Sequence, residues 1–464
     1  MSGNNVVTKR VTLLIASVSS FLTPFLSSSI NIALPSIGAE FGIDVVYLSW
    51  LVTSYLLATA VFLVPFGRIA DIYGKKRVFL CGTFTFTVGS LLAVFVTSAE
   101  VLLLTRVLQG LGSAMVFGTG VAILISVYPL QERGKALGIN VAAVYLGLSI
   151  GPTVGGFLTH YWGWRSIFLA TAALGVLVII LVLSKLKGEW IDAPGEKFDL
   201  PGSLMYGAMV LCMMFGFSNI PSALGFLLLG VGIGGLLFFI WWELRVESPV
   251  LEMRLFRHNL AFTFSNLAAL INYSATFAVT FILSLYLQYI QGYGEVEAGL
   301  IMIFQPVVMF VLSPLAGRLS DRIEPRIVAS IGMGFSALGL MMLISLSTDT
   351  PLVYLIACLV ILGFGFGLFS SPNTNAVMSA VKKKYYGVAS GIIGTMRLFG
   401  QMFSMSLVTL IFSFYIGGMQ VNPENSSLFL QSIHIAFAIF AILCVFGIAA
   451  SLARGKVHEQ EEPE

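Results

Sequence analysis

Two arginines, Arg106 and Arg397, lie inside long apolar stretches of this sequence. A guanidinium in hydrocarbon is costly unless it faces a water-filled cavity, pairs with another charge or donates hydrogen bonds to backbone carbonyls. No aspartate or glutamate lies in the middle of such a stretch, so a buried carboxylate that could exchange a proton for a cation is missing. A functional and a structural role are equally open for Arg106, whereas Arg397 is more simply explained as a side chain reaching toward the interface.

Milder polar side chains occur along the same stretches. If they face a central cavity they need no protein partner; otherwise they form interhelical hydrogen bonds, worth about 0.6 kcal/mol each on average. Methionines and phenylalanines around them would make such a cavity suit an amphipathic or apolar solute. The candidate residues for binding a solute, or for coupling its movement to an ion, are Arg106, Gln109, Asn31, Tyr145, Gln305, Asn375 and Arg397.

Glycines recur at every fourth position in the segment Gly147–Gly156. On a helix, residues at this spacing share one face, and glycines there let a neighbouring helix pack backbone against backbone. A proline in the same segment loosens the helix locally. We therefore expect a packing site formed by Gly147, Gly151, Pro152, Gly155 and Gly156.

Two short charged segments follow apolar runs, 250 residues apart: the first island, Gly67–Arg77, and the second island, Gly317–Arg322. Both contain Gly-Arg-x-x-Asp. The glycines allow close backbone approach, the aspartate can cap a helix start, and the cations favour the cytoplasmic side. Two copies of one hinge predict a duplicated membrane bundle. The candidate gating residues are Gly67, Asp71, Gly74, Arg77, Gly317 and Asp321.

The composition is that of an integral membrane protein. The 464 residues are 57% hydrophobic and 10% charged, with a mean hydropathy of +0.94, whereas a soluble domain carries roughly 25% charged residues. Fourteen segments are long enough to cross a hydrocarbon core of about 30 Å. The predicted spans are 11–34, 48–68, 78–98, 101–125, 135–158, 166–184, 202–219, 223–243, 260–286, 297–317, 327–347, 352–376, 388–415 and 429–452.

The positive charges predict how these spans are oriented. Of the 25 lysines and arginines, two lie within spans, 22 fall on the side of the N-terminus and only Arg165 falls on the other side. Because cytoplasmic loops are enriched in Lys and Arg, we expect both termini to be cytoplasmic and the chain to be a multi-pass protein of the plasma (cytoplasmic) membrane.

The predicted spans form two halves of six, with two further spans between them. We therefore expect an all-α integral membrane fold with 14 transmembrane helices, in which two pseudo-symmetric six-helix bundles are joined by two inserted central helices. The predicted domains are an N-terminal bundle at 1–184, linkers and inserted helices at 185–258, a C-terminal bundle at 259–453 and a cytoplasmic tail at 454–464.

The first island resembles the cytoplasmic loop motif of the major facilitator superfamily, roughly Gly-x-Leu-Ala-Asp-x-x-Gly-Arg-Lys. Gly147–Gly156 resembles the antiporter signature of that family's exporters. The segment Arg106–Ala114 resembles its fourth-helix motif, in which the arginine is linked to proton coupling. With its two extra central spans, the whole chain resembles the fourteen-span drug/proton antiporter group of multidrug efflux transporters. In the first span Leu26 departs from that group, which usually has an aspartate there.

The resemblance implies a secondary active transporter that exports hydrophobic or amphipathic compounds by alternating access, with a proton as coupling ion. Because of Leu26, an alternative is a facilitator or antiporter for an organic anion or lipid, not coupled through a buried carboxylate. A membrane sensor that kept the fold is a third possibility. We expect a monomer in the lipid bilayer with a small-molecule substrate, no cofactor, no metal, no nucleic acid and no enzyme activity. The sequence leaves the substrate and the stoichiometry open.

Overall fold

The computed structural model describes residues 2–220, 222–246, 249–251, 253, 256, 259–320, 322–381, 386–417 and 426–455. These residues form helices and connecting turns, with no strand among them. Fourteen helical stretches are long and apolar enough to cross a membrane. The prediction of an all-α membrane chain with fourteen spans is confirmed. Helices suit this composition because a backbone in lipid must satisfy its polar groups within its own segment.

The chain divides into two compact units, and the first comprises Met1–Ile43, Trp50–Gly216 and Leu227–Leu251. Its helices are α1 (Ser2–Phe41), α3 (Lys75–Val94), α4 (Ala99–Val127), α5 (Leu130–Trp162), α6 (Arg165–Lys185), and most of α2 (Val45–Tyr73), α7 (Leu200–Ser218) and α8 (Ala223–Glu243).

The helices α1 and α2 both end several residues beyond the predicted positions. The first predicted span ended at residue 34, but α1 continues through Pro35 to Phe41. The second ended at residue 68, but α2 continues to Tyr73. Because α3 begins at Lys75, the first island is the joint of two nearly continuous helices and not an extended loop.

The second unit comprises Asp44–Ser49, Phe217–Phe226 and Glu252–Glu464. Its helices are α10 (Leu260–Thr276), α11 (Ala278–Leu285), the π-helical turn η1 (Tyr286–Ile290), α12 (Glu295–Met302), α13 (Phe304–Ser320), α14 (Pro325–Leu343), α15 (Leu352–Ser379), α16 (Tyr386–Tyr415) and α17 (Ser426–Ala453).

Two spans of the second unit are interrupted. The span predicted at 260–286 consists of α10, α11 and η1, and the span at 297–317 consists of α12 and α13. At the joint of α10 and α11, Ala278 N donates a hydrogen bond to Ser404 Oγ of α16 at 3.1 Å. A neighbouring helix thus supplies an acceptor at the point where the local helical ladder breaks, as an interrupted membrane helix requires.

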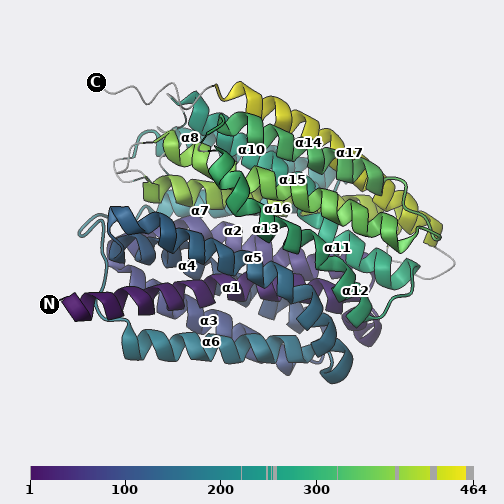
Figure 1. Ribbon diagram of the computed structural model, residues 1–464, viewed down its shortest axis with the longest axis horizontal. Helices are drawn as coiled ribbons and strands as arrows, with labels where there is room; N and C mark the ends of the chain where they lie inside the picture. The colour runs from purple at the N-terminus through teal and green to yellow at the C-terminus, as the bar shows by residue number, and fades with distance from the viewer. Residues whose placement is uncertain are drawn as a thin grey trace. The chain divides into compact units, whose positions relative to one another are not determined.

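The two units repeat one set of helix contacts. In the first unit α1 packs on α5, α4 and α6, and α3 packs on α4 and α6. In the second unit α10 packs on α16, α15 and α17, and α14 packs on α15 and α17. Figure 1 shows one of these contacts plainly, with α6 running alongside α3. Counted in spans, each of these five contacts in one half has its counterpart in the other, which agrees with two pseudo-symmetric six-helix bundles.

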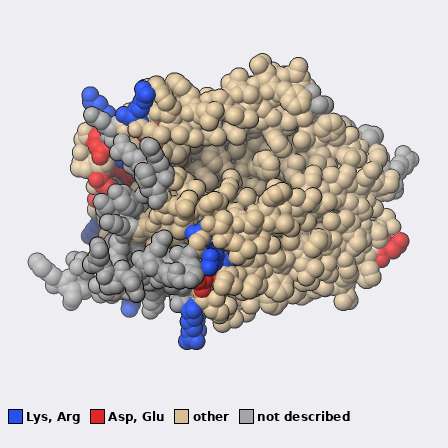
Figure 2. Space-filling view, turned by 90° about the horizontal axis from the view of Figure 1, so that it is seen from above, with Lys and Arg blue, Asp and Glu red and all other residues tan. Residues whose placement is uncertain are grey.

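The described surface suits a hydrocarbon environment. Most of the surface visible in Figure 2 carries neither Lys and Arg nor Asp and Glu. Only 17% of the apolar stretch of α8 is buried inside the protein, and large side chains such as Leu227 and Leu237 are exposed on it. Apolar surface of this extent is unfavourable in water and stable against lipid chains.

Candidate substrate and gating sites

Arg106 is fully buried in α4, and its contacts in the described part of the chain are with neutral groups. Its Nε donates to the backbone oxygen of Leu51 at 3.0 Å, and its Nη1 donates to Gln109 Oε1 at 2.6 Å. The guanidinium carbon lies 4.5 Å from the centre of the Tyr55 ring. Nη2 has no hydrogen-bond partner among the described residues. The guanidinium therefore keeps a donor group available.

Side chains of α2, α3 and α4 form a hydrogen-bonded network around Arg106. Gln109 Nε2 donates to Ser90 Oγ at 3.1 Å, and the Tyr55 hydroxyl lies 2.7 Å from Ser113 Oγ. A Cβ atom on Gly110 would lie 2.5 Å from the backbone oxygen of Tyr55, so glycine is needed for this approach of α4 to α2. The network holds the guanidinium of Arg106 in place, which is consistent with a structural role. The Nη2 group of Arg106, which has no acceptor among the described residues, is consistent with a functional role.

The glycine face of α5 packs directly on α1. A Cβ atom on Gly147 would lie 2.6 Å from the backbone oxygen of Phe21, and one on Gly151 would lie 1.9 Å from Ser28 Oγ. At Gly155 the added atom would meet the next residue of α1, Ser29, at 2.7 Å. Ser29 Oγ donates to the backbone oxygen of Gly151 at 2.9 Å, which joins the two helices. Two further members of the motif are buried in the same helix: Pro152 and Gly156.

In the first island, Gly74 forms the joint between α2 and α3. Its φ of +120° is a conformation that other residues rarely adopt. Asp71 lies half-buried at the end of α2, with Oδ1 3.9 Å from Lys75 Nζ. Gly67 lies beside α4, where a Cβ atom on Gly118 would be 3.5 Å from its Cα. These contacts place the island against α4 and the start of α3.

The acceptor at the start of α3 is not the one the sequence suggested. Asp71 was a candidate cap, but Lys76 N donates to Glu189 Oε1 at 2.7 Å, from the linker between α6 and α7. Arg77 is exposed, and its Nε lies 3.7 Å from Glu189 Oε2. Glu189 is thus a site residue that sequence reasoning missed. The available signal was the run of three acidic residues within 189–196, opposite in sign to the cations of the island.

The second island packs on α15. A Cβ atom on Gly317 would lie 2.8 Å from Ser371 Oγ. Ser320 Oγ donates to the backbone oxygen of Gly317 at 2.8 Å and accepts from Asn375 Nδ2 at 3.1 Å. Asn375, predicted as a solute-binding residue, therefore contacts the end of α13. Asp321 lies outside the described residues.

The other predicted site residues are spread over both units. Asn31 of α1 and Tyr145 of α5 are buried, with 4% and 7% of their surface exposed. Gln305 of α13 is half-buried. Arg397 of α16 is also half-buried, and its guanidinium carbon lies 5.2 Å from the centre of the Tyr273 ring. Among the seven candidates, Arg106 and Gln109 are joined by a hydrogen bond.

Arg454, which the sequence assigned to the cytoplasmic tail, is only 2% exposed. Its Nη1 donates to Asn373 Oδ1 at 3.0 Å and to Ser265 Oγ at 3.2 Å, and its Nε donates to the backbone oxygen of Ser451 at 2.9 Å. Burial, with a smaller contribution from nearby Arg326, lowers the pKa of Arg454 to about 10, so it is charged at pH 7. Sequence reasoning missed this contact because the apolar run ends one residue earlier.

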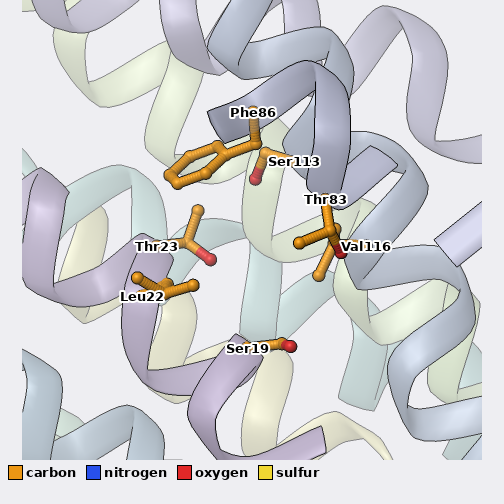
Figure 3. A pocket seen from close by; sticks show the side chains of 7 residues that line it. All are labelled: Ser19, Leu22, Thr23, Thr83, Phe86, Ser113 and Val116. Atoms are coloured by element: carbon orange, nitrogen blue, oxygen red, sulfur yellow. The ribbon is translucent and has the colours of Figure 1, made fainter. Parts of the chain in front are cut away.

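A small cavity in the first unit lies among α1, α3 and α4 (Figure 3). It offers about 10 Å³ to the centre of a water molecule, which is roughly enough for one water and too little for an organic solute. The residues lining it are Ser19, Leu22, Thr23, Thr83, Phe86, Ser113 and Val116. This cavity is therefore not a substrate site in the arrangement described.

The sequence matches the Major Facilitator Superfamily over residues 16–405 and again over residues 265–464. The chain belongs to that family of membrane transporters. The second match begins at residue 265, within α10, as expected for an internal repeat. Family and fold identify a transporter and not an enzyme, and they account for a small-molecule substrate and a membrane location.

Relatives with assigned roles match this sequence over most of its length. The riboflavin transporter RibZ of Clostridioides difficile is 30% identical, over 95% of this chain and 96% of its own. The multidrug resistance protein Stp of Mycobacterium tuberculosis is 31% identical, over 86% of this chain and 75% of its own. The cephamycin export protein CmcT of Amycolatopsis lactamdurans is 31% identical, over 96% of this chain and 94% of its own.

A solved structure supports the fold. A bacterial homologue of the human lysosomal transporter Spinster superposes with a TM-score of 0.70, covering 98% of each chain at 15% identity. At that identity the likeness concerns the fold alone.

Proposed function

We propose that this transporter exports hydrophobic or amphipathic compounds by alternating access. The observation that carries the proposal is the glycine face of α5 packed on α1, at the motif that resembles the exporter signature. The name of the relative CmcT, a cephamycin export protein, supports the same direction of transport. In this proposal the gating residues are those of the two islands, and the close contact of α5 with α1 keeps two helices of one bundle moving as one body.

The proposed substrate is neutral or acidic rather than cationic. Leu26, at the position where the drug antiporters usually have an acidic residue, is 1% exposed. Arg106 has a free Nη2 and neutral neighbours, which favours a solute carrying a carbonyl, a phenolate or a carboxylate. The riboflavin transporter among the relatives supports an amphipathic heteroaromatic solute as a first compound to test.

Proton antiport is the proposed coupling, with both termini in the cytoplasm and the plasma membrane as the location. Asp71 is the candidate proton carrier, because it is a half-buried carboxylate at the end of a span. Arg106, Gln109, Asn31, Tyr145, Gln305, Asn375 and Arg397 remain the proposed solute-binding or coupling residues.

A second candidate function is an uncoupled or anion-selective carrier for an organic anion or lipid. Two observations favour it: the free donor of Arg106, and the lack of any mid-span carboxylate in the sequence. In that function Arg106 and Arg397 would contact the negative group of the substrate.

Flux in proteoliposomes separates the two functions. The purified chain is reconstituted and the movement of riboflavin, a neutral dye and an anionic dye is measured with and without an imposed pH gradient. Antiport predicts accumulation driven by an opposing proton gradient and abolished by a protonophore. Anion-selective flux that ignores the gradient supports the second function. No flux of any compound, in protein whose fold is verified by its thermal transition, contradicts both.

A further inference from the structure

The linker between α6 and α7 lies along the first island and is joined to it through backbone atoms. Asp192 N and Ala193 N donate to the backbone oxygen of Asp71 at 3.1 and 3.0 Å, and Lys75 N donates to the backbone oxygen of Trp190 at 3.0 Å. These hydrogen bonds set the register between linker and island whatever the side chains are. A chance surface contact between mobile loops would not satisfy backbone groups on both sides of the helix joint.

The linker caps the start of α3, and the island caps the end of α6. The first N–H groups of a helix have no partner within the helix, and a negative charge there is favourable. At the start of α3 the Glu189 carboxylate supplies the missing acceptor: it accepts a hydrogen bond from Lys76 N at 2.7 Å. In return Lys76 Nζ donates to the backbone oxygen of Leu186 at 2.5 Å, at the end of α6, where a cation is favourable. The two helix ends are therefore held by one reciprocal contact.

Each acidic side chain of the segment 189–196 faces a cation of the island. Glu189 lies 3.7 Å from Arg77, Asp192 pairs with Lys75, and Glu196 pairs with Arg68. In the pair with Asp192 the lysine side chain is only 5% exposed. A buried ammonium that lost this carboxylate would be left with Asp71 at 3.9 Å.

Gly74 adds an independent geometric observation. A Cβ atom at this position would lie 2.6 Å from the Glu189 side chain, and its φ of +120° excludes most other residues. The joint of α2 and α3 is therefore shaped to receive the linker.

We propose that residues 189–196 form a brace that fixes the first island and stays attached to it while the transporter works. Glu189, Asp192 and Glu196 are positioning residues: they act on Asp71 and Gly74 through backbone and helix-end contacts. Detachment would expose the start of α3 and leave Lys75 with the more distant carboxylate of Asp71, so the island moves with its linker. The consequence for transport rests on the proposed function, whereas the attachment itself does not.

Attachment is tested by cysteine labelling, independently of transport. Ala193 is 7% exposed and lies within the brace, whereas Lys187 is exposed beside it. Ala193→Cys and Lys187→Cys are made separately in a chain whose four natural cysteines are replaced by alanine, and both are reacted with a membrane-impermeant maleimide in open membranes. The brace predicts slow labelling at 193 and fast labelling at 187. Adding Glu189→Ala with Asp192→Ala should raise the rate at 193 by about tenfold or more, because local opening becomes more populated.

Transport is the second readout. Glu189→Ala removes the cap of α3 and should lower the transport rate by about tenfold, whereas Glu189→Gln keeps an acceptor and should retain most of the rate. Glu132→Ala is the matched control: it removes an exposed cytoplasmic-side carboxylate paired with Lys9 at 2.9 Å, and should change the rate less than about twofold.

The two readouts have distinct meanings. Equal labelling rates at positions 193 and 187, in the cysteine-free background that keeps Glu189 and Asp192, overturn the brace, whatever the transport result. Protection at 193 that disappears while substrate is being transported overturns the claim that the brace stays attached. Normal transport by Glu189→Ala, with accelerated labelling, overturns the positioning role. Absence of transport in the unaltered chain counts against the proposed function and leaves the labelling result intact.

Discussion

Arg106 and Arg454 are both almost wholly buried arginines, but their surroundings differ. Arg454 donates to neutral acceptors on the helices α10, α15 and α17, so its contacts explain its position as a link between helix ends. Arg106 has a backbone carbonyl and a glutamine as acceptors, and its Nη2 has no acceptor among the residues that the structure describes. The residue with the unused donor is the better candidate for binding a solute.

We predict that Arg106→Gln lowers transport by about tenfold or more at unchanged membrane insertion, because the amide cannot supply the free charged donor. Initial rates in proteoliposomes, normalised to reconstituted protein, give the effect. The matched control is Arg245→Gln, which removes an exposed arginine 4.2 Å from the centre of the Trp241 ring and should leave the rate nearly unchanged. If the role of Arg106 is purely structural, the substitution should instead lower the thermal midpoint and the transport rate in parallel.

Asp71→Asn should abolish transport while leaving expression and insertion intact. The amide cannot carry a proton and weakens the charge interaction with Lys75 Nζ at 3.9 Å. Asp349→Asn, at an exposed carboxylate in the connection between α14 and α15, is the control and should transport normally. Retained flux in Asp71→Asn would count against a gating or coupling role for the first island.

At the scale of helices, small residues decide which surfaces approach. The α5 face built on Gly147, Gly151 and Gly155 meets the backbone of α1, whereas Gly230 and Gly234 of α8 have no atom within 4 Å of an added Cβ. Replacement of glycine by a larger residue is therefore excluded at the α5 positions and tolerated at the α8 positions. Glycine is required only where a neighbouring helix packs directly against it.

Gly151→Leu should block transport, because even a Cβ atom would lie 1.9 Å from Ser28 Oγ and the two helices would have to separate. Flux and thermal stability are compared with those of Gly230→Leu, the same change at a position with open space. We expect normal flux from the α8 variant. Full activity of Gly151→Leu would remove the case for close packing in the mechanism.

The joint between α10 and α11 should depend on α16. Ser404→Ala leaves the Ala278 N–H without its acceptor, which costs about 1–3 kcal/mol for a buried donor. We expect a lower thermal midpoint, measured by fluorescence of the detergent-solubilised protein. Ser406→Ala is the control, because the hydroxyl of Ser406 donates to Met402 O in its own helix. Equal midpoints for both variants would show that the joint does not need the hydroxyl.

At the scale of the whole molecule, the repeat is the main organising feature. Each unit repeats the same contacts among its first, third, fourth, fifth and sixth spans, and the family match restarts at residue 265. Two bundles of this kind are the parts that alternating access requires. The positive charges on one side of the predicted spans then predict which ends of both bundles face the cytoplasm.

The predicted orientation is tested by cysteine accessibility at exposed positions. Lys187→Cys in the first unit and Arg318→Cys in the second should react from the cytoplasmic side, whereas Asp349→Cys should react only from outside. Intact cells and inside-out vesicles are labelled with the same impermeant reagent. Labelling of Lys187→Cys and Arg318→Cys from opposite sides would contradict the duplicated arrangement.

The amino-acid sequence was enough to predict the number of spans, the two islands and the family resemblance. It could do so because an isolated helix in lipid must be long, apolar and internally hydrogen-bonded, all of which are local properties. It was less accurate where helices end: α2 reaches Tyr73, and two predicted spans are interrupted.

Tertiary structure alone decided which residues meet. Glu189 caps a helix that begins 114 residues earlier in the chain, at Lys75, and Arg454 reaches Ser265 across 189 residues. No local pattern encodes such contacts, because they depend on where the chain returns after several crossings. Arg106 and Gln109 could be selected as candidate site residues from their polarity and their positions within a predicted span. The neutral surroundings of Arg106 and its available donor follow only from how α2, α3 and α4 pack together.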